Sequence, residues 1–565
     1  KGLWRSPVAH LVRIEGVRGS TPLSSTPSPH DRSNAVGARA PAAFVLRHRV
    51  GPTRHTADVS ESPAPSDAPA GHAVPDTRDG AVMVPGETCW RIERAVGYAV
   101  FVDAADYFAT LKQAVLRAER RVLFIGWDFE PRIRLDPRTP GRARDDRLGR
   151  VLEAAVRSNP ELEIGVLQWG LGALQTLARG GLPAVLLNRR TPDRLTFTVD
   201  HRHPIGAAHH QKIVVIDDCL AFAGGIDVTA DRWDTSEHLD RNPLRHRPSS
   251  RRPTKPWHDA TTLMSGPAAR ALGDLARERW ESGTGRRLAP IEGVQPCWPE
   301  GVEPLLTDVD VAVSRTRPEH GGKDLVHEIE LLWLAAIAAA RRTVYIESQY
   351  FANRRVAEAI ADRLGEADGP DVVVLNPESA DGWLEEKAMG TARARLFGIV
   401  NRADVHDRFR LYVPVADGGR PIYVHAKVLI VDDRLLRIGS SNLNNRSMGL
   451  DTECDVTVEA REDDPQRAEI SAAVLAVRDR LLGEHLGVEP SAVADAVKAE
   501  DGSLVRAVES LRRPEGRSLR TFEPPEQTGV DRVLAETELL DAEHTPNRWS
   551  RVRRSFHGLY RRRRD

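Results

Sequence analysis

Two segments of this 565-residue chain repeat one pattern of polar residues at the same spacing. After His210, and again after His425, Lys follows at +2, Asp at +7, Gly at +14, and Asp or Asn at +17. The apolar residues between them match as well, IVVI in the first segment and VLIV in the second, and the two histidines lie 215 positions apart (425 minus 210). A repeat of this kind indicates one supersecondary unit built twice. We therefore expect two similar halves.

The sequence around each repeat alternates between helical and strand patterns. Helical spacing in FVDAADYFATLKQAVLRAERR is followed by the apolar run RVLFIGWDFE, and LVHEIELLWLAAIAAARR is followed by TVYIESQYF. Alternation of this type predicts an α/β protein. The expected fold is two pseudo-symmetric α/β sandwich halves, each a mixed β-sheet flanked by helices, with one active site at their interface.

Composition divides the chain into four regions. Residues 1–88 are rich in Pro, Ser and Ala and are predicted to be disordered. Residues 89–295 form the first half and residues 296–490 the second. Residues 491–565 are expected to be a tail with one helix at DRVLAETELLDAE and a basic end. The long basic loop 235–256 is expected to line the substrate entrance.

Charge and cysteine content exclude some classes of protein. Lys plus Arg is 80 and Asp plus Glu is 81, so the net charge of −1 gives no general attraction to nucleic acid. The four cysteines are far apart and predict buried thiols rather than a disulfide framework or a zinc site. No apolar run is long enough for a transmembrane helix and the first residues do not resemble a signal peptide, so we expect a cytoplasmic protein that contacts membranes at their surface.

The repeated residues suit chemistry on a phosphodiester. Residues i and i+2 of a strand share a face, so His210 projects with Lys212, and His425 with Lys427. Two such halves facing each other give a pocket with two imidazoles and two ammonium groups. The lysines would neutralise charge on the phosphorus oxygens, one neutral imidazole would attack phosphorus, and the other, protonated, would protonate the leaving oxygen. The alternative, two ordinary hairpins, leaves matched lysines in apolar strands unexplained.

At this point the chain resembles the phospholipase D superfamily, which is marked by two HxKxxxxD motifs. The motifs are HHQKIVVIDDCLAFAGGIDVTADRWD and VHAKVLIVDDRLLRIGSSNLNNRSMGLDTE, and the resemblance covers roughly residues 89–485. The first motif, YIESQYF at 345–351 and PWHD at 256–259 resemble the phosphatidylcholine-type enzymes. The resemblance implies metal-independent hydrolysis of glycerophospholipids to phosphatidic acid through a phosphohistidine, transfer to alcohols, no cofactor, and a phospholipid partner at a membrane surface. With both motifs in one chain, a monomer is expected.

The resemblance also implies roles for individual residues. His210 would be the nucleophile and His425 the general acid, and the catalytic set comprises His210, Lys212, Asp217, His425, Lys427 and Asp432. Asp217 and Asp432 are expected to tie down the turn beside each motif. Asn442 would bind phosphate, whereas Asp227 at the matching position indicates an asymmetric pocket. Glu347, Gln349 and Trp257 are candidate substrate-binding residues, with burial or packing as the alternative role.

A carboxylate should orient each histidine through its Nδ1 proton. Glu453 lies 28 residues after His425 and is assigned to it. The same offset from His210 reaches His238, which cannot serve, so Asp234 or Asp240 is the candidate there. A zinc site from the cluster His201, His203, His209 and His210 is conceivable. The paired motif explains His210 without metal, and no metal site is expected.

Three other functions remain open. A cardiolipin synthase-like phosphatidyltransferase is the runner-up, although its members usually begin with transmembrane helices. A nuclease is less consistent with two motifs in one chain and the balanced charge. A non-catalytic lipid-binding scaffold would not need both motifs intact. The basic, aromatic C-terminal end suits an anionic lipid surface or is simply a solvated charged end.

Overall fold

The computed structural model describes residues 80–139, 145–170, 172–173, 184–295, 298–379 and 383–524. All of these residues belong to one compact unit of the chain, residues 72–565. Most of the predicted disordered segment, the predicted helix at 531–543 and the basic C-terminal end lie outside the described residues. Among the described helices, none has the length and hydrophobicity needed to cross a bilayer.

The first half begins at β1 and ends at α5. Its elements in chain order are β1 (Arg91–Val102), α1 (Ala104–Leu116), β2 (Arg121–Gly126), α2 (Leu148–Ser158), β3 (Glu163–Trp169), α4 (Ala184–Asn188), β4 (Leu195–Asp200), β5 (Ile213–Ile216), β6 (Leu220–Gly224), β7 (Trp257–His258), β8 (Ala260–Ser265) and α5 (Pro267–Thr284).

The second half repeats this order and extends it. Its elements are β9 (Leu306–Arg317), β10 (Val326–His327), α6 (Glu328–Ala339), β11 (Thr343–Glu347), α7 (Arg354–Gly365), β12 (Asp371–Leu375), α8 (Trp383–Ala403), β13 (Phe409–Val415), β14 (Tyr423–Val424), β15 (Val428–Val431), β16 (Leu435–Gly439), α9 (Asn445–Gly449), β17 (Glu453–Glu459), α10 (Arg467–Leu486), α11 (Pro490–Ala499), α12 (Leu504–Leu511) and β18 (Ser518–Thr521).

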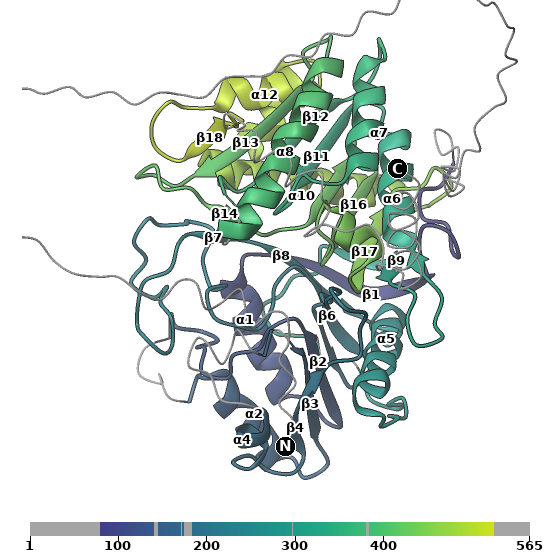
Figure 1. Cartoon of the computed structure of the whole chain (residues 1–565), viewed down its shortest axis with the longest axis vertical. Coiled ribbons are helices and arrows are strands. Elements are labelled where there is room, and N and C mark those ends of the chain that lie inside the picture. Colours follow the sequence, from purple (N-terminus) through teal and green to yellow (C-terminus); the bar gives the residue numbers. More distant parts are fainter. Residues whose placement is uncertain are drawn as a thin grey trace, which may run out of the picture. The chain divides into compact units, whose positions relative to one another are not determined.

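The sheets of the two halves join into one. The strand order is β18-β13-β12-β11-β15-β16-β17-β9-β1-β8-β6-β5-β2-β3-β4, and β1 and β9 lie side by side in the middle (Figure 1). These two strands pair antiparallel, with Arg91 opposite Val313 and Gly97 opposite Thr307. Read outward from this seam, the strands of the two halves follow the same order, and each side mixes parallel with antiparallel pairs. The predicted fold class is confirmed, and the continuity of the sheet is an addition to it.

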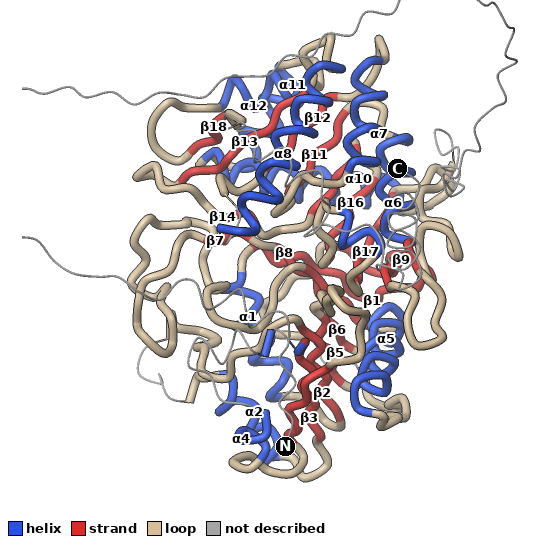
Figure 2. Tube along the Cα trace, in the orientation of Figure 1, coloured by secondary structure: helices blue, strands red, loops and turns tan. Residues whose placement is uncertain are grey.

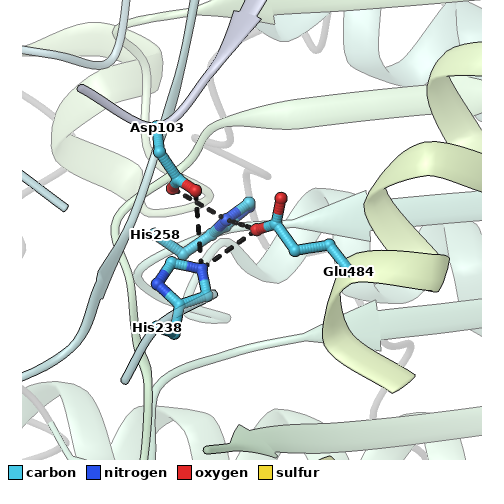
Figure 3. A group of neighbouring side chains, drawn as sticks. All are labelled: Asp103, His238, His258 and Glu484. Atoms are coloured by element: carbon cyan, nitrogen blue, oxygen red, sulfur yellow. Dashed lines mark hydrogen bonds and ion pairs between the residues drawn. The ribbon is translucent and has the colours of Figure 1, made fainter. Parts of the chain in front are cut away.

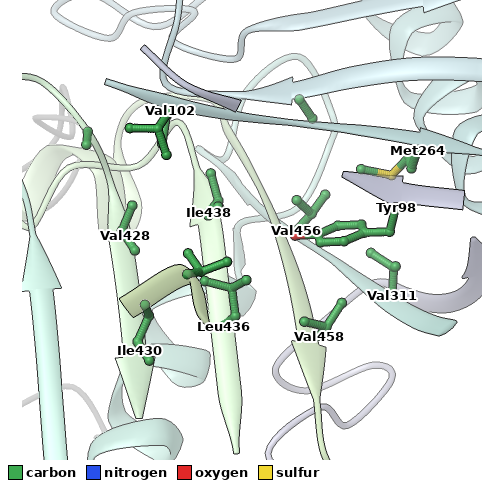
Figure 4. Close-up of a cluster of buried hydrophobic side chains, with 14 of the residues drawn as sticks. Tyr98, Val102, Met264, Val311, Val428, Ile430, Leu436, Ile438, Val456 and Val458 are labelled. Carbon is green, nitrogen blue, oxygen red and sulfur yellow. The ribbon is translucent and has the colours of Figure 1, made fainter. Parts of the chain in front are cut away.

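Helices cover both faces of the sheet because its strands are apolar on both sides. In β2, Val122 and Phe124 pack with α1 and α2, whereas Leu123 and Ile125 face the opposite side and pack with α5. In the second half, α6, α7 and α8 cover one face and α10 the other. Figure 2 shows the strands in red with the helices around them. One apolar cluster contains side chains of both halves, including Met264 of the first and Val456 of the second (Figure 4).

The described structure extends beyond both predicted domain limits. Val82 and Met83, which lie before the expected boundary at residue 89, are buried, and their backbone N–H groups donate to the carboxylate of Glu459. After residue 490, β18 pairs with β13 through Tyr412 and Thr521. The apolar face of α12, LVRAVESL, explains why this part of the predicted tail packs onto the second half.

Candidate active site

Each motif histidine stands just before a strand and is held by the backbone of the other half. His210 precedes β5, and its N–H donates to the carbonyl of Thr452 at 2.9 Å. His425 precedes β15, and its N–H donates to the carbonyl of His258 at 2.8 Å. The contact between His425 and His258 continues the short parallel pairing of β7 with β14. The two motifs therefore meet where the halves join, as the sequence predicts.

The carboxylates that accept from the histidines are exchanged between the halves. His210 Nδ1 lies 3.0 Å from both carboxylate oxygens of Glu453. His425 Nδ1 lies 2.7 Å from Asp259 Oδ2. Both acids are fully buried. An Nδ1–H donated to a carboxylate leaves Nε2 of each imidazole free for phosphorus or for a proton.

The sequence-based assignment of these carboxylates was wrong. Glu453 orients His210 and not His425, and Asp234 does not orient His210. Asp234 is buried and accepts instead from Arg245 at 2.7 Å, and the alternative, Asp240, accepts backbone N–H groups near residue 418. Asp259, the partner of His425, was missed as an orienting group.

The strand registers explain why Asp259 was missed. Gly224 pairs with Thr261, and Gly439 pairs with Asp455, so Asp259 and Glu453 stand two residues before equivalent positions. Their offsets from the motif histidines differ, however: 49 (259 minus 210) against 28 (453 minus 425). The difference of 21 residues corresponds to the long loop before β7. The signal that could have found Asp259 was the segment PWHD at 256–259, just before an apolar strand.

The lysines enter the same site but differ in their partners. Lys212 Nζ lies 3.1 Å from Asp227 Oδ2, and it donates to the carbonyl of His210. Lys427 donates to the carbonyl of His425, and Asn442 takes the position of Asp227 in this half. The Asn442 Oδ1 atom is buried and has no hydrogen-bond partner among the described residues. Because one lysine faces a carboxylate and the other half offers an amide, the charges of the pocket are asymmetric.

Burial and the clustered cations control the protonation of both imidazoles. Burial lowers the pKa of His210 well below its usual value, and Lys212 and Lys427 lower it further. Burial likewise lowers the pKa of His425, with Lys427, Arg232 and Lys212 contributing and His210 adding to the effect. Burial also lowers the pKa of Lys427 to about 7, against the opposing effect of Asp259. The site therefore favours neutral imidazoles and gains most from an anionic ligand.

The motif aspartates stabilise turns and do not line the pocket. Asp217 accepts the backbone N–H groups of residues 119, 120 and 121 at 2.6–2.8 Å. Asp432 accepts those of residues 341, 342 and 343 at 2.7–2.8 Å. Both stand at φ 53°, in the left-handed region. The predicted turn-holding role of Asp217 and Asp432 is confirmed, and neither is placed to contact a substrate.

The motif glycines serve strand packing. A Cβ on Gly224 would lie 2.5 Å from Thr261 Cα, and one on Gly439 would lie 2.7 Å from Asp455 Cα. Both contacts are with the adjacent strand of the sheet. The absence of a side chain at these two positions therefore admits the neighbouring strand.

Of the three predicted substrate-binding residues, Trp257 lies beside His425, and Gln349 contacts Tyr423, on which Trp257 stacks. The Trp257 ring is 5.0 Å from the His425 ring and stacks on Tyr423 at 4.7 Å. Gln349 Nε2 donates to the hydroxyl of Tyr423 at 2.9 Å. The guanidinium of Arg232, which sequence reasoning missed, lies 4.2 Å from the Trp257 ring centre. These residues form an aromatic and basic wall beside His425.

Glu347, the third of the predicted substrate-binding residues, is not in this wall. It is fully buried and accepts from His258 Nε2 at 2.9 Å and from Tyr345. His485 Nε2 lies 3.2 Å from its other oxygen. Burial alone would raise its pKa, but His258 and His485 lower it to about 2. The prediction of a substrate-contacting Glu347 was wrong because its strand carries it into the interior.

The predicted histidine cluster is separated by other partners. His209 Nδ1 lies 3.0 Å from Thr452 Oγ1, and its Nε2 faces Arg279 and Asp200. His203 accepts from the indole N–H of Trp169 at 3.1 Å. The groups of described residues whose geometry could hold a metal ion are centred elsewhere, on His258.

Parts of the chain are similar to known proteins. Residues 333–472 match a family described as "Cardiolipin synthase, PLD-like domain". The chain is 25% identical to Phospholipase D A of Dictyostelium discoideum over 472 residues, which are 70% of this chain and 36% of that protein. It is 25% identical to Phospholipase D2 of Bos taurus (65% and 49%) and 30% identical to Cardiolipin synthase A of Pseudomonas putida over 321 residues (55% and 56%).

The matches are partial in length. The chain spans about a third to somewhat over half of the length of these curated relatives. Among solved structures, phosphatidylserine synthase of Haemophilus influenzae Rd KW20 is matched with a TM-score of 0.46 at 13% identity, covering 73% of this chain and 96% of that one.

Proposed function

We propose that the chain is a member of the phospholipase D superfamily, which its matches support, and that it cleaves the head-group phosphodiester of glycerophospholipids to phosphatidic acid. The observation that carries this proposal is the paired site. His210 and His425 each direct Nδ1 to a buried carboxylate of the opposite half, and Lys212 and Lys427 lie beside them. Two imidazoles can act as nucleophile and general acid, and two ammonium groups can stabilise the charge on the phosphorus oxygens, as in-line displacement at phosphorus requires.

The first step forms a covalent intermediate. His210 Nε2 attacks phosphorus while Glu453 accepts from Nδ1, and the bond between phosphorus and the head-group oxygen breaks. His425 gives its Nε2 proton to that oxygen, so the head group leaves as an alcohol and not as an alkoxide. The pKa of His425 is low in the free protein. The negative charge of the bound diester raises this pKa, so His425 becomes protonated when the substrate binds. The lysines stabilise the charge that gathers on the phosphorus oxygens.

The second step returns the protein to its starting state. His425, now neutral, takes a proton from water, and the hydroxide attacks phosphorus as the bond to His210 Nε2 breaks. Phosphatidic acid leaves and His425 is again protonated. An alcohol that replaces water gives a phosphatidyl alcohol by the same route, so transphosphatidylation accompanies hydrolysis. None of these steps uses a metal ion.

A phosphatidyltransferase of the cardiolipin synthase type is the second candidate. It is favoured by the family match over residues 333–472 and by the 30% identity to Cardiolipin synthase A of Pseudomonas putida. The intermediate is the same in both reactions, and only the acceptor alcohol differs. For either reaction we propose a monomer acting at the surface of a membrane, since one chain carries both motifs.

The test is head-group release from mixed phospholipid vesicles, with and without ethanol, in the presence of EDTA. We expect phosphatidic acid without ethanol, phosphatidylethanol with it, and neither product from His210→Ala. His406→Ala, a change of an exposed histidine between α8 and β13, is the matched control and should behave as wild type. Transfer to phosphatidylglycerol with little hydrolysis would favour the second candidate. No product from any vesicle by folded protein would refute both.

The roles of the two histidines can be separated with a substrate whose leaving group is p-nitrophenol, because this group needs no proton to depart. His425→Ala should release one equivalent in a burst and then stall with the phosphatidyl group on His210. Quenching with denaturant at neutral to mildly alkaline pH, which preserves the acid-labile N–P bond, and mass spectrometry can locate this group. His210→Ala should give no burst. A burst from His210→Ala instead would assign the nucleophile to His425.

A further inference from the structure

Four side chains meet behind the active site, where the halves join. Asp103 follows β1, His238 lies in the loop between β6 and β7, and His258 ends β7; Glu484 projects from α10 of the second half. Figure 3 shows the two imidazoles and two carboxylates directed at one common centre. All of their ligand atoms lie within 4.8 Å of one another.

This group is closed to solvent. Asp103 is 2% exposed, both histidines are 0% exposed, and the side chain of Glu484 is 4% exposed. Carboxylates at this depth require positive charge close by, because their hydration is lost. A cation inside the group would supply it.

The distances fit a tetrahedral ion. Glu484 Oε1 lies 3.0 Å from His238 Nε2 and 2.8 Å from His258 Nδ1. Asp103 Oδ2 lies 3.6 Å from the first of these nitrogens, and Asp103 Oδ1 lies 3.3 Å from the second. Zinc bonds of 2.0–2.1 Å in a tetrahedron place ligand atoms about 3.3 Å apart. The separations to Glu484 are shorter than this value and those to Asp103 match or slightly exceed it, and at 3.6 Å Asp103 Oδ2 is too far from His238 Nε2 for a hydrogen bond.

Outer carboxylates hold both imidazoles with the required nitrogen inward. His238 Nδ1 lies 3.1 Å from Asp234, which leaves Nε2 for the centre. His258 Nε2 lies 2.9 Å from Glu347, which leaves Nδ1 for the centre. Metal-bound histidines characteristically donate their other N–H to such a partner. The roles of Asp234 and Glu347, which are not in the active site, are thereby explained.

A second observation points to a missing ligand. The Asp103 Oδ2 atom is buried in the group and has no hydrogen-bond partner among the described residues. Asp103 and His238 also have φ of 66° and 42°, in the left-handed region that side chains other than glycine seldom adopt. Such backbone strain persists where the surrounding structure fixes a functional geometry.

We propose that Asp103, His238, His258 and Glu484 bind one structural Zn²⁺ ion. Two imidazoles and two carboxylates are a donor set that zinc accepts, and four protein ligands leave no open position for a substrate. The ion would join the first half to α10 of the second. It would also fix His258, whose neighbour Asp259 accepts from His425, so the ion would act on catalysis only by positioning.

The competing arrangement is a buried network of two protonated histidines. Of the four carboxylates around this centre, Asp103, Asp234, Glu347 and Glu484, Asp234 pairs with the guanidinium of Arg245. Zinc with two neutral imidazoles adds two positive charges, and so do two imidazolium ions without zinc. The total charge is therefore the same in the two arrangements and cannot distinguish them. A direct measurement of the metal content can.

The experiment is the zinc content of the full chain, expressed with zinc in the medium, desalted, and analysed by inductively coupled plasma mass spectrometry. We expect about one zinc per chain in the wild type and in His246→Gln, which changes an exposed histidine of the same loop. His238→Gln and Asp103→Asn should lower the affinity for zinc by at least about tenfold and so lose the ion on desalting. Metal-free wild type, or full retention by both variants, would overturn the proposal.

A second measurement on the wild-type chain guards against misfolded variants. Cobalt(II) supplied in place of zinc should give the intense visible absorption of a tetrahedral site, and zinc should raise the melting temperature of chelator-stripped protein. An octahedral cobalt spectrum, or stoichiometric manganese or iron in protein grown with zinc, would overturn the assignment of tetrahedral zinc. His210→Ala should keep its zinc, so this result is independent of the proposed catalytic function.

Discussion

Changing Glu453 to Gln replaces one orienting carboxyl group, whose pKa burial raises to about 8, with an amide of nearly the same shape. In the structure this acid is fully buried, lies 3.0 Å from His210 Nδ1, and accepts from the hydroxyls of Ser440 and Ser447. The amide that replaces it cannot present two accepting oxygens to the imidazole. We therefore expect Glu453→Gln to weaken the nucleophile specifically.

The size of the effect follows from the contact that is lost. The His210 ring becomes positively charged when it attacks phosphorus, and a hydrogen bond to a charged group contributes about 1.5–3 kcal/mol. Each 1.4 kcal/mol corresponds to about a tenfold change in rate. This loss alone gives roughly 10- to 100-fold. Where the amide N–H points at Nδ1, the imidazole takes the wrong tautomer, and the loss can reach about 10⁴-fold in kcat. We expect a decrease of about 10²- to 10⁴-fold.

The assay uses the p-nitrophenol substrate, with Asp259→Asn as the matched variant of the other half. Asp259 lies 2.7 Å from His425, whose proton this leaving group does not need. Glu453→Gln should slow the burst, whereas Asp259→Asn should leave the burst and slow the later turnover that needs His425. The reverse pattern, or wild-type rates from Glu453→Gln, would refute the exchange of carboxylates between the halves.

Three further predictions concern pH, charge and packing. Because burial and the lysines lower the pKa of His210, the acid limb of kcat/KM should lie below pH 6.5, and a pH–rate profile with a limb above that value would contradict this. Asn442→Asp should raise KM about tenfold, since a new carboxylate repels phosphate at a cost of roughly 1.4 kcal/mol; unchanged vesicle kinetics would argue against a phosphate contact. Arg437→Met should lower the free energy of unfolding by about 3–5 kcal/mol, because it leaves Asp455 buried without its ion-pair partner; urea denaturation at wild-type stability would disprove this.

The repeat alone was enough to predict the two-half architecture and the meeting of the motifs. Matched offsets from His210 and His425 place equivalent strands, and period-2 geometry places each lysine beside its histidine. The turn-holding role of Asp217 and Asp432 also followed from the sequence, because each aspartate stands between two short apolar strands. These features are local, so they can be predicted from the order of residues within each segment.

The orienting carboxylates could not be predicted in this way. An offset in the chain gives an equivalent position only where the two halves have equal loops, and the loop before β7 is longer by 21 residues. Nor does any offset show that Glu453 reaches across to His210, because that contact depends on how β9 and β1 are paired. Glu347 was misplaced for a similar reason, since its strand position does not reveal that His258 comes from the other half to meet it.

The crossed pairs of histidine and carboxylate make each half an incomplete unit of function. By symmetry, a chain with one half alone would hold a histidine without its carboxylate, and could complete it only by pairing with a second copy across the strand edge that β1 or β9 provides. Two copies in one chain remove that need for association. They also allow the halves to diverge, as Asp227 and Asn442 have done at equivalent positions. Fusion thus permits a division of labour between the two histidines that an assembly of identical halves could not encode.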